Sequence, residues 1–537
     1  MRAIDSKCCL AEGIFLAAAP SESTMHKNHL AVTLRAVAVS LALAVSPWTP
    51  SNPAWAGPGL PSLGEGADLS PRLERQLGDS IIRTLYRDPD YLDDPVLQDY
   101  VQTQWLALLA AARTRGELPP ELDEHFAWQV LLGRDRSVNA FALPGGYLGV
   151  HLGLLAVVGS RDELASVLAH ELSHVTQRHI ARLLMQQNRQ TPLLLGTMVL
   201  AMLAASKNPE AAQAISVSGQ ALAVQNQLNF SRDMEREADR VGYGLMAPAG
   251  FAPQGFVGMF DKLQQANRLN DNGSWPYLRS HPLTTQRVAD MQARLPLHHT
   301  AEHKASTPTL EHAMLTARAR VLSRPGVDKL RQWMAEPQNA AFGQRPLEQQ
   351  VGALYAAILS AEALREPRQA RQWLPRLHAL AQTNARAQTL AQWLEAEVEL
   401  SAGDAASAWR KLPALGQTDR PGLLLRAQIA TALGQVTEEI LGPLQTWVSS
   451  HPQDAGAWQT LASAWQTQGQ TLRAIRAEAE AHAAHYDFAA AIDRLKAGQD
   501  WARRSRSAQD FVEASIIDTR LRAVQALAQE QAALATR

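Results

Sequence analysis

Two histidines flank a glutamate in a five-residue stretch that can bind a metal ion. Residues 170–174 read His-Glu-Leu-Ser-His. Because an α-helix turns about 100° per residue, His170 and His174 would lie one turn apart on the same face. Two imidazoles placed in this way can share a tetrahedral zinc ion, and Glu171, rotated away from them, can take a proton from water activated at that ion. The motif therefore predicts metal-assisted hydrolysis.

A pair of acidic residues farther along the chain supplies the other groups that such a site needs. Glu235 and Asp239 stand in the segment SRDMEREADRVG, in which Ser231 can cap a helix. Their i, i+4 spacing places both carboxylates on one helix face. Glu235 would complete a His-His-Glu set for one Zn²⁺ per chain, and Asp239 would orient a ligating histidine or hold a proton. The alternative is an ordinary solvated helix face.

The segment around the two histidines has the pattern of a buried helix. Ser160 and Glu163 match a capping box at its start. Apolar residues follow at helical spacing: Leu164, Leu168, Leu172 and Val175. Residues 70 to about 132 are also predicted to be helical, with breaks at prolines and at a glycine: Pro89, Pro95 and Gly116.

A change of pattern at residues 137–150 predicts a short strand or hairpin. Apolar residues alternate with other types there, and a pair of glycines follows. The part from Phe141 to Val150 can serve as an edge strand, to which an extended substrate adds a strand of its own. A hairpin inside the core is the alternative.

The composition indicates a globular chain of several domains. Of 537 residues, 46% are hydrophobic, and 51 basic residues nearly balance 52 acidic ones. The net charge of −1 creates no overall field that would attract nucleic acid, and no nucleic-acid partner is expected. Cys8 and Cys9 are the only cysteines, which argues against a disulfide framework, a cysteine-ligated zinc site and a cysteine protease.

The N-terminal region has the layout of a secretory signal over residues 25–56. A positive start, a short apolar run at 36–45 and small residues before position 57 follow one another. Residues 1–24 are predicted to be a dispensable extension, with Met25 as the alternative start. Cleavage would deliver the chain to the periplasm. An uncleaved apolar run would instead make a membrane-anchored protease.

The rest of the chain is predicted to be mainly α and to divide into two domains. A helical zincin-type metalloprotease domain with a small β-hairpin or edge strand covers 57–300, and a linker covers 301–309. An all-α, tetratricopeptide-like repeat domain covers 310–537, because a glycine recurs there about every 34 residues after an amphipathic segment: Gly403, Gly434 and Gly469. Stacked helical hairpins bury apolar faces that one hairpin cannot. An unrelated helical bundle is the alternative.

These motifs together resemble a known family. The pair H-E-x-x-H and E-x-x-A-D (235–239) is similar to the gluzincin family of the CAAX-prenyl endopeptidases. Three more features resemble its secreted, BepA-type periplasmic branch. They are the segment NAFALPGGYLGV (139–150), the triplet Ser280-His281-Pro282 followed by Arg287, and the helical C-terminal part.

The resemblance implies a zinc metalloendopeptidase with roles for five residues. His170, His174 and Glu235 would bind zinc. Glu171 would be the general base, and Asp239 would be a supporting residue or proton donor. Polypeptide substrates follow, with misassembled outer-membrane proteins as the expected class. The repeat domain would dock these clients or the outer-membrane assembly machinery.

Three neighbouring features have alternative roles: His281, Arg287 and the apolar run Leu193–Ala205. His281 would occupy the open coordination position as a removable fourth ligand, or would donate to the oxyanion, as Arg287 also can. The apolar run Leu193–Ala205 is too short for a bilayer span. It would be a lid over the active site, a peripheral contact with a membrane or a membrane-protein client, or a core helix.

A function from another class is a chaperone-like interaction scaffold for outer-membrane assembly, with a latent or structural zinc site. Glu171 favours catalysis, because a purely structural site needs no carboxylate beside its ligands.

Overall fold

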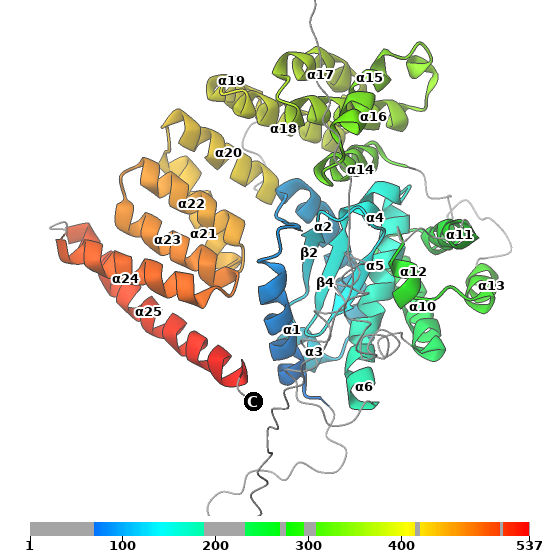
Figure 1. The fold of residues 1–537 in the computed structure, drawn as a ribbon, viewed down its shortest axis with the longest axis horizontal. Coiled ribbons are helices and arrows are strands. Elements are labelled where there is room, and N and C mark those ends of the chain that lie inside the picture. The colour runs from blue at the N-terminus through cyan, green and yellow to red at the C-terminus, as the bar shows by residue number, and fades with distance from the viewer. Residues whose placement is uncertain are drawn as a thin grey trace, which may run out of the picture. The chain divides into compact units, whose positions relative to one another are not determined.

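The computed structural model describes residues 69–186, 231–268, 275–294, 308–413, 419–504 and 508–535 (Figure 1). All of these belong to one unit of the chain, Gly64–Arg537. The predicted extension and signal, the run Leu193–Ala205 and most of the linker lie outside the described residues. No described helix is long and apolar enough to cross a membrane.

A four-stranded sheet lies beside the helix that carries the two histidines (Figure 1). The strand order is β1-β2-β4-β3. Strands β2 and β4 pair in parallel, and the two outer pairs are antiparallel. The strands are β1 (Tyr91–Leu92), β2 (Gln129–Gly133), β3 (Ala140–Leu143) and β4 (Tyr147–His151). The prediction of a short strand or hairpin over 137–150 is confirmed, and β3 forms an edge among the described strands.

The prediction of helix up to residue 132 is wrong at its end, where β2 forms. Val130, Leu131 and Leu132 are buried beside β4. A short apolar run of this kind has no periodicity that separates strand from helix, so its partner strand decides its conformation.

Prolines begin the three helices that precede and follow β1. The helices are α1 (Pro71–Leu85), α2 (Pro95–Thr114) and α3 (Pro120–His125). Proline suits the first helical turn, because its missing N–H would have no partner there. Ser70 and Asp94 accept a backbone hydrogen bond at the starts of α1 and α2. Gly116, after α2, has a φ of +70°, which favours glycine and matches the predicted break.

Helix α5 (Arg161–Thr176) carries the H-E-x-x-H motif and is buried along most of its length. Ser160 caps it, accepting a hydrogen bond of 3.1 Å from the Glu163 N–H. The Glu163 carboxylate accepts from the Gly159 N–H at 2.6 Å, so the reciprocal half of the capping box is displaced by one residue. The sheet, α2 and the helices α10 (Arg232–Met246) and α11 (Gln254–Arg268) surround α5. Because α5 is enclosed on several sides, its buried residues include polar ones, such as His170, Glu171 and His174, beside the apolar stripe.

Helices α5 and α10 approach closely at Gly242. A Cβ atom at that position would lie 3.0 Å from the backbone of Ala169, next to His170. The glycine thus lets the backbone of α10 approach α5 one residue from the first histidine of the motif. Short elements complete the neighbourhood: α4 (Leu152–Val157), α6 (His179–Gln186), α12 (Tyr277–Ser280) and α13 (Thr285–Ala293).

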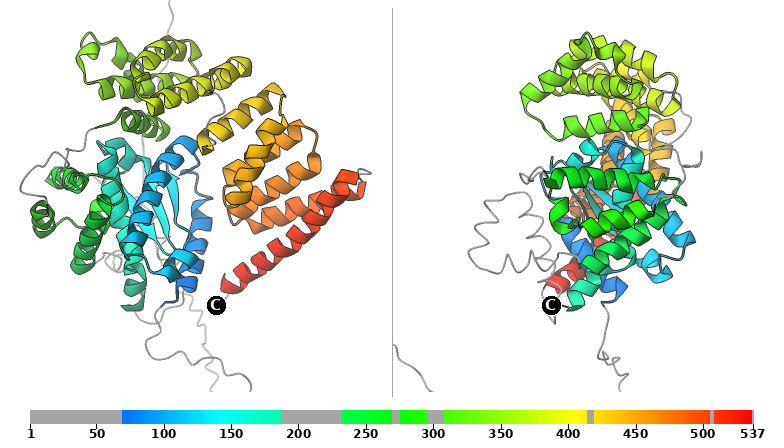
Figure 2. Two further views of the ribbon diagram at one scale, coloured as in Figure 1. Left: turned by 180° about the vertical axis from the view of Figure 1, so that it is seen from behind. Right: turned by 90° about the vertical axis from the view of Figure 1, so that its right-hand side faces the viewer.

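The C-terminal helices form successive hairpins (Figure 2). The three recurring glycines stand in the turns after α18, α20 and α22, with φ values of +83°, +66° and +73°. The predicted helical hairpins are therefore present, while their assignment to tetratricopeptide repeats stays a prediction. The helices are α14 (Leu310–Leu322), α15 (Val327–Ala335), α16 (Leu347–Ala363), α17 (Pro367–Ala381), α18 (Ala385–Ser401), α19 (Ala405–Lys411), α20 (Arg420–Leu433), α21 (Glu438–Ser450), α22 (Ala455–Thr467), α23 (Thr471–Ala484), α24 (Phe488–Arg504) and α25 (Ala508–Ala535), with short 3₁₀ turns at Glu336–Gln338 and Phe342–Gln344.

The turn between α23 and α24 packs against the N-terminal helix and the sheet. The Tyr486 hydroxyl lies 2.9 Å from the Tyr147 hydroxyl and 3.3 Å from Asp79 Oδ1. The ring of His485 stacks on Tyr86, with 4.2 Å between the centroids. Burial in this contact, together with the nearby His482, lowers the pKa of His485 to about 4.

This depressed pKa predicts that the contact weakens in acid. The pKa of His485 in the unfolded chain is about 6.5, so between pH 6.5 and 4 the unfolded state binds a proton that the folded state excludes. Stability should fall over that window by up to about 3 kcal/mol. We expect the melting temperature of the wild type to drop more than that of His485→Gln when the pH is lowered from about 7.5 to about 5. Equal drops would contradict the prediction.

Candidate metal centre

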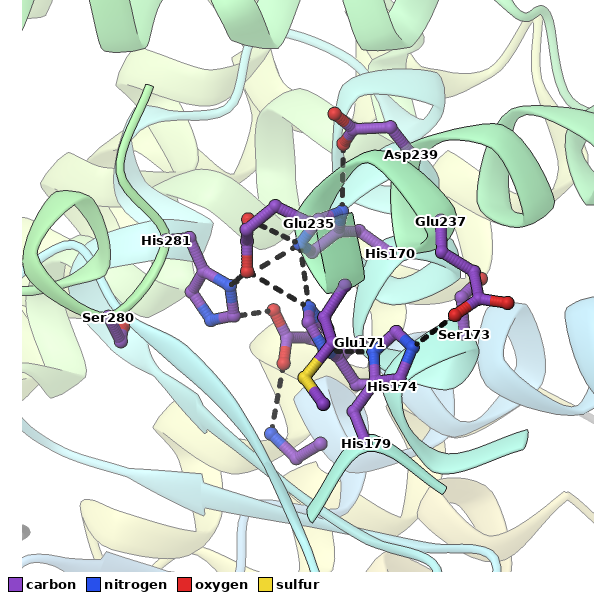
Figure 3. A network of polar contacts seen from close by, with 12 residues as sticks. His170, Glu171, Ser173, His174, His179, Glu235, Glu237, Asp239, Ser280 and His281 are labelled. Carbon is purple, nitrogen blue, oxygen red and sulfur yellow. Dashed lines mark hydrogen bonds and ion pairs between the residues drawn. The ribbon is translucent and has the colours of Figure 1, made fainter. Parts of the chain in front are cut away.

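Four side chains from three helical segments meet at one point beside the sheet (Figure 3). His170 and His174 come from α5, Glu235 from α10 and His281 from the end of α12. One ligand atom from each can be chosen so that all four lie within 4.8 Å of one another. Each of these residues is at most 2% exposed. The structure thus brings together the three residues predicted as ligands and the residue predicted as a removable fourth.

The donor atoms of this cluster turn toward one another. His170 Nε2 lies 3.0 Å from His174 Nε2 and 3.3 Å from His281 Nδ1. Glu235 Oε1 lies 3.0 Å from His281 Nδ1 and 3.4 Å from His174 Nε2. Imidazole lone pairs that face each other repel unless a proton or a cation lies between them. Buried imidazoles with one carboxylate are a donor set that fits zinc.

The carboxylate of Glu171 lies between this cluster and the edge strand. Its Oε2 accepts a hydrogen bond of 2.9 Å from the Ala142 N–H of β3. Its Oε1 has no hydrogen-bond donor among the described residues and lies 3.4 Å from His281 Nε2. The strand therefore holds one oxygen of Glu171 and leaves the other directed at the cluster, where a general base belongs.

Asp239 and Arg287 form an ion pair behind the cluster. Asp239 Oδ1 lies 3.0 Å from His170 Nδ1, the nitrogen that faces away from the cluster. Arg287 donates to both oxygens of Asp239, at 2.7 and 2.8 Å, and its Nη1 lies 2.6 Å from Glu235 Oε2. Burial opposes the charged form of Asp239, but hydrogen bonds from Arg287 and His170 outweigh it and lower the pKa of the carboxyl.

These contacts bear on two roles expected from the sequence. Asp239 is placed to support His170, as one of its two predicted roles requires. Arg287 directs its guanidinium to Asp239, Glu235 and the Pro282 carbonyl, and it is 4% exposed. The structure therefore surrounds it with acceptors of the protein itself, and its role as an oxyanion donor stays a prediction.

The pKa values of the two histidines of α5 are shifted in opposite directions. Burial alone would lower the pKa of His170, but the hydrogen bonds that Asp239 and Glu235 accept from its ring raise the pKa to about 9. Burial lowers the pKa of His174 well below its usual value. A metal ion that enters this cluster must displace the proton of His170, so metal affinity should rise with pH.

Two functional candidates were missed by the sequence analysis. His179 Nδ1 lies 2.8 Å from His174 Nδ1, and His179 Nε2 lies 3.0 Å from Glu237 Oε2. His179 begins α6, after a turn in which Arg178 has a φ of +54°. That turn redirects the chain, so helical spacing cannot relate His179 to His174. The only sequence signal was a third histidine soon after the motif.

A group of potential metal ligands on a buried helix, with a glutamate beside it and an edge strand alongside, is the arrangement of a metallopeptidase. Comparison with known proteins agrees. Residues 98–295, which include every residue of the site, match the model of Peptidase family M48.

The relatives of this chain extend beyond the peptidase part. It is 30% identical over 448 residues to the beta-barrel assembly-enhancing protease of Yersinia pestis, an alignment that covers 81% of this chain and 86% of the relative. It is 34% identical to the putative beta-barrel assembly-enhancing protease of Vibrio cholerae, over 50% of this chain and 53% of that protein. The mitochondrial metalloendopeptidase OMA1 of Arabidopsis thaliana is 31% identical over 36% of each chain. The chain belongs to Peptidase family M48 and is a metalloendopeptidase.

Proposed function

We propose that this chain is a zinc-dependent endopeptidase of the periplasm that degrades or processes misassembled outer-membrane proteins. The observation that carries the proposal is the convergence of His170, His174 and Glu235 on one point, with Glu171 beside it. The names of the bacterial relatives, which refer to beta-barrel assembly, support the substrate class. The predicted secretory signal supports the location.

Each residue of the site has a separate role in the proposed peptide hydrolysis. When bound by His170, His174 and Glu235, zinc would acidify water and polarise the scissile carbonyl. Glu171 accepts the proton of the attacking water at Oε1 and passes it to the leaving amine. Asp239 holds the ring of His170 through its Nδ1.

The edge strand offers a binding site for an extended substrate. The Ala142 N–H of β3 donates to Glu171, so the outer edge of this strand faces the proposed general base. A peptide added along β3 would pair with backbone groups and pass close to Glu171. Strand β4 pairs with the opposite edge of β3, so it would not obstruct the added strand.

The helical hairpins after residue 310 would bind clients or the outer-membrane assembly machinery. Stacked hairpins present an extended surface of the kind that repeat proteins use for protein ligands. The domain boundaries predicted at 300 and 310 belong to this proposal, as does a peripheral membrane contact through Leu193–Ala205.

Zinc content and hydrolysis together test the proposed function. We expect one zinc per chain by elemental analysis of purified protein. We also expect cleavage of casein that a chelator abolishes and added Zn²⁺ restores. Metal-free protein that cleaves casein equally well would refute the zinc mechanism.

A latent site within an interaction scaffold is the second candidate function. It is favoured by His281, whose Nδ1 lies 3.0 Å from Glu235 Oε1 and 3.3 Å from His170 Nε2. A fourth protein ligand would fill the position that the attacking water needs. The ring of His281 also stacks on Tyr277, with centroids 4.6 Å apart, which holds it in place.

Replacement of His281 distinguishes a removable ligand from an oxyanion donor. If His281 blocks the open position, His281→Ala should raise casein hydrolysis several-fold while zinc content stays at one per chain. If it donates to the oxyanion, the same variant should lose about 10²–10³-fold in kcat. Unchanged hydrolysis with zinc retained would contradict both roles.

A further inference from the structure

We propose that His179 and Glu237 are positioning residues that set the ring orientation and the tautomer of His174 for metal binding. The proposal rests on the ligand role proposed for His174. It assigns to the start of α6 a part in the metal site that the sequence motif does not contain.

A series of side-chain contacts connects the protein surface to the metal-ligand cluster. Figure 3 shows the part that runs from Glu237 through His179 to His174. Arg182 of α6 donates to Glu237 Oε2 at 2.6 Å. The same oxygen lies 3.0 Å from His179 Nε2, and His179 Nδ1 lies 2.8 Å from His174 Nδ1. His179 and His174 are fully buried, while the side chain of Glu237 is 31% exposed. These contacts thus join α6 and α10 to the second histidine of α5.

One arrangement of protons satisfies every link when His174 binds a metal. A ligating Nε2 must present a lone pair, so the proton of neutral His174 lies on Nδ1. That N–H donates to His179 Nδ1, which must then be an acceptor. His179 therefore carries its own proton on Nε2 and donates it to Glu237. The Glu237 carboxylate, at the end of this series of contacts, can only accept hydrogen bonds. It therefore specifies the tautomers of both imidazole rings.

The two histidines of α5 are supported in different ways. A carboxylate, Asp239, contacts the outer nitrogen of His170 directly. His174 reaches its carboxylate only through a second imidazole. Ligating histidines usually donate their other N–H to such a group, and loss of the partner weakens metal affinity. By this reasoning His179 fixes the orientation and tautomer of His174, as Asp239 does for His170.

The turn before His179 is held in place by contacts that Arg178 makes with residues near the start of α1. Arg178 has a left-handed φ of +54°; its Nη2 lies 3.1 Å from Glu74 Oε2 and also donates to the Leu69 carbonyl. Glu74 is a buried residue of α1. The strained turn is therefore held from outside, which keeps His179 directed back at α5.

A purely structural role for His179 is the competing explanation, in which it only ties α6 to α10. Two amide variants distinguish these explanations, because each can replace the hydrogen bond of a different ring nitrogen of His179. In His179→Asn the side-chain oxygen can replace Nδ1 and accept from His174. In His179→Gln the amide can replace Nε2 and reach Glu237, but it leaves the His174 N–H without this acceptor.

The experiment measures Zn²⁺ affinity of the full-length apoprotein by competition with a chelator, together with the melting temperature of the apoprotein. We expect His179→Gln to bind Zn²⁺ about 10–100-fold more weakly than wild type, and His179→Asn to stay close to wild type. Equal affinities for the two variants, whether both normal or both reduced, would overturn the proposal. If wild type itself bound no Zn²⁺, the proposed function would fail instead.

Glu237→Gln gives a second, more exposed test in case the buried variants unfold. Its amide can present an N–H to His179, which permits the wrong tautomer, so we expect weaker Zn²⁺ binding than in wild type. Asp233→Asn is the matched control, because Asp233 is another acid of α10 whose side chain is 83% exposed and pairs with Arg236. Equal Zn²⁺ affinity for Glu237→Gln and Asp233→Asn would contradict the role of Glu237.

Discussion

Glu171→Gln is expected to abolish peptide hydrolysis while the protein remains folded and binds zinc. The amide keeps the shape of the side chain but cannot take a proton from water. General acid–base catalysis contributes about 10²–10⁴-fold, so kcat for casein-type substrates should fall by that factor. Steady-state hydrolysis, zinc content by elemental analysis and the melting temperature check the three parts of the prediction.

The Glu171→Gln variant also distinguishes the protease hypothesis from the scaffold hypothesis. If the helical hairpins act mainly as a scaffold, Glu171→Gln will still support assembly of client proteins in cells. If hydrolysis is the main activity, the variant will hold clients without processing them. Full hydrolysis by Glu171→Gln would show that another group is the base. His281, whose Nε2 is 3.4 Å from Glu171 Oε1, would then be the first candidate.

Glu235→Gln is expected to remove zinc and, with it, all activity. The substitution takes the single anionic ligand from a buried set of three imidazoles. It also leaves the positive Arg287, whose Nη1 is 2.6 Å from Glu235 Oε2, beside the metal position with less compensating charge. Loss of a metal that supplies several kcal/mol of transition-state stabilisation corresponds to at least about 10³-fold in rate.

The metal itself provides the measurement for Glu235→Gln. After dialysis against a weak chelator, we expect wild type to retain one zinc per chain and the variant to retain far less. Asp233→Asn, on the same helix and exposed, should behave as wild type. Retention of full zinc and full activity by Glu235→Gln would show that His281 replaces the carboxylate as third ligand, and the proposed ligand set would be wrong.

The local elements of the site were predictable because their signals are local. A capping serine and helical spacing place His170 and His174 on one face of α5, whatever the rest of the chain does. The same holds for Ser231, which accepts the Met234 N–H at the start of α10, and for the glycines in left-handed turns of the C-terminal hairpins. The strand β2 was not predictable, because the neighbouring β4 decides its conformation.

The sequence by itself determined which residues could do the chemistry and how α5 and α10 begin, because capping and periodicity act over a few residues. Only the tertiary structure decided which of these side chains meet. The close approach of α5 and α10 at Gly242, the approach of His281 from α12 and the turn that returns His179 to His174 all depend on packing between segments far apart in sequence. No periodicity along one helix encodes such distances, since they are set by how the buried surfaces of separate helices fit together.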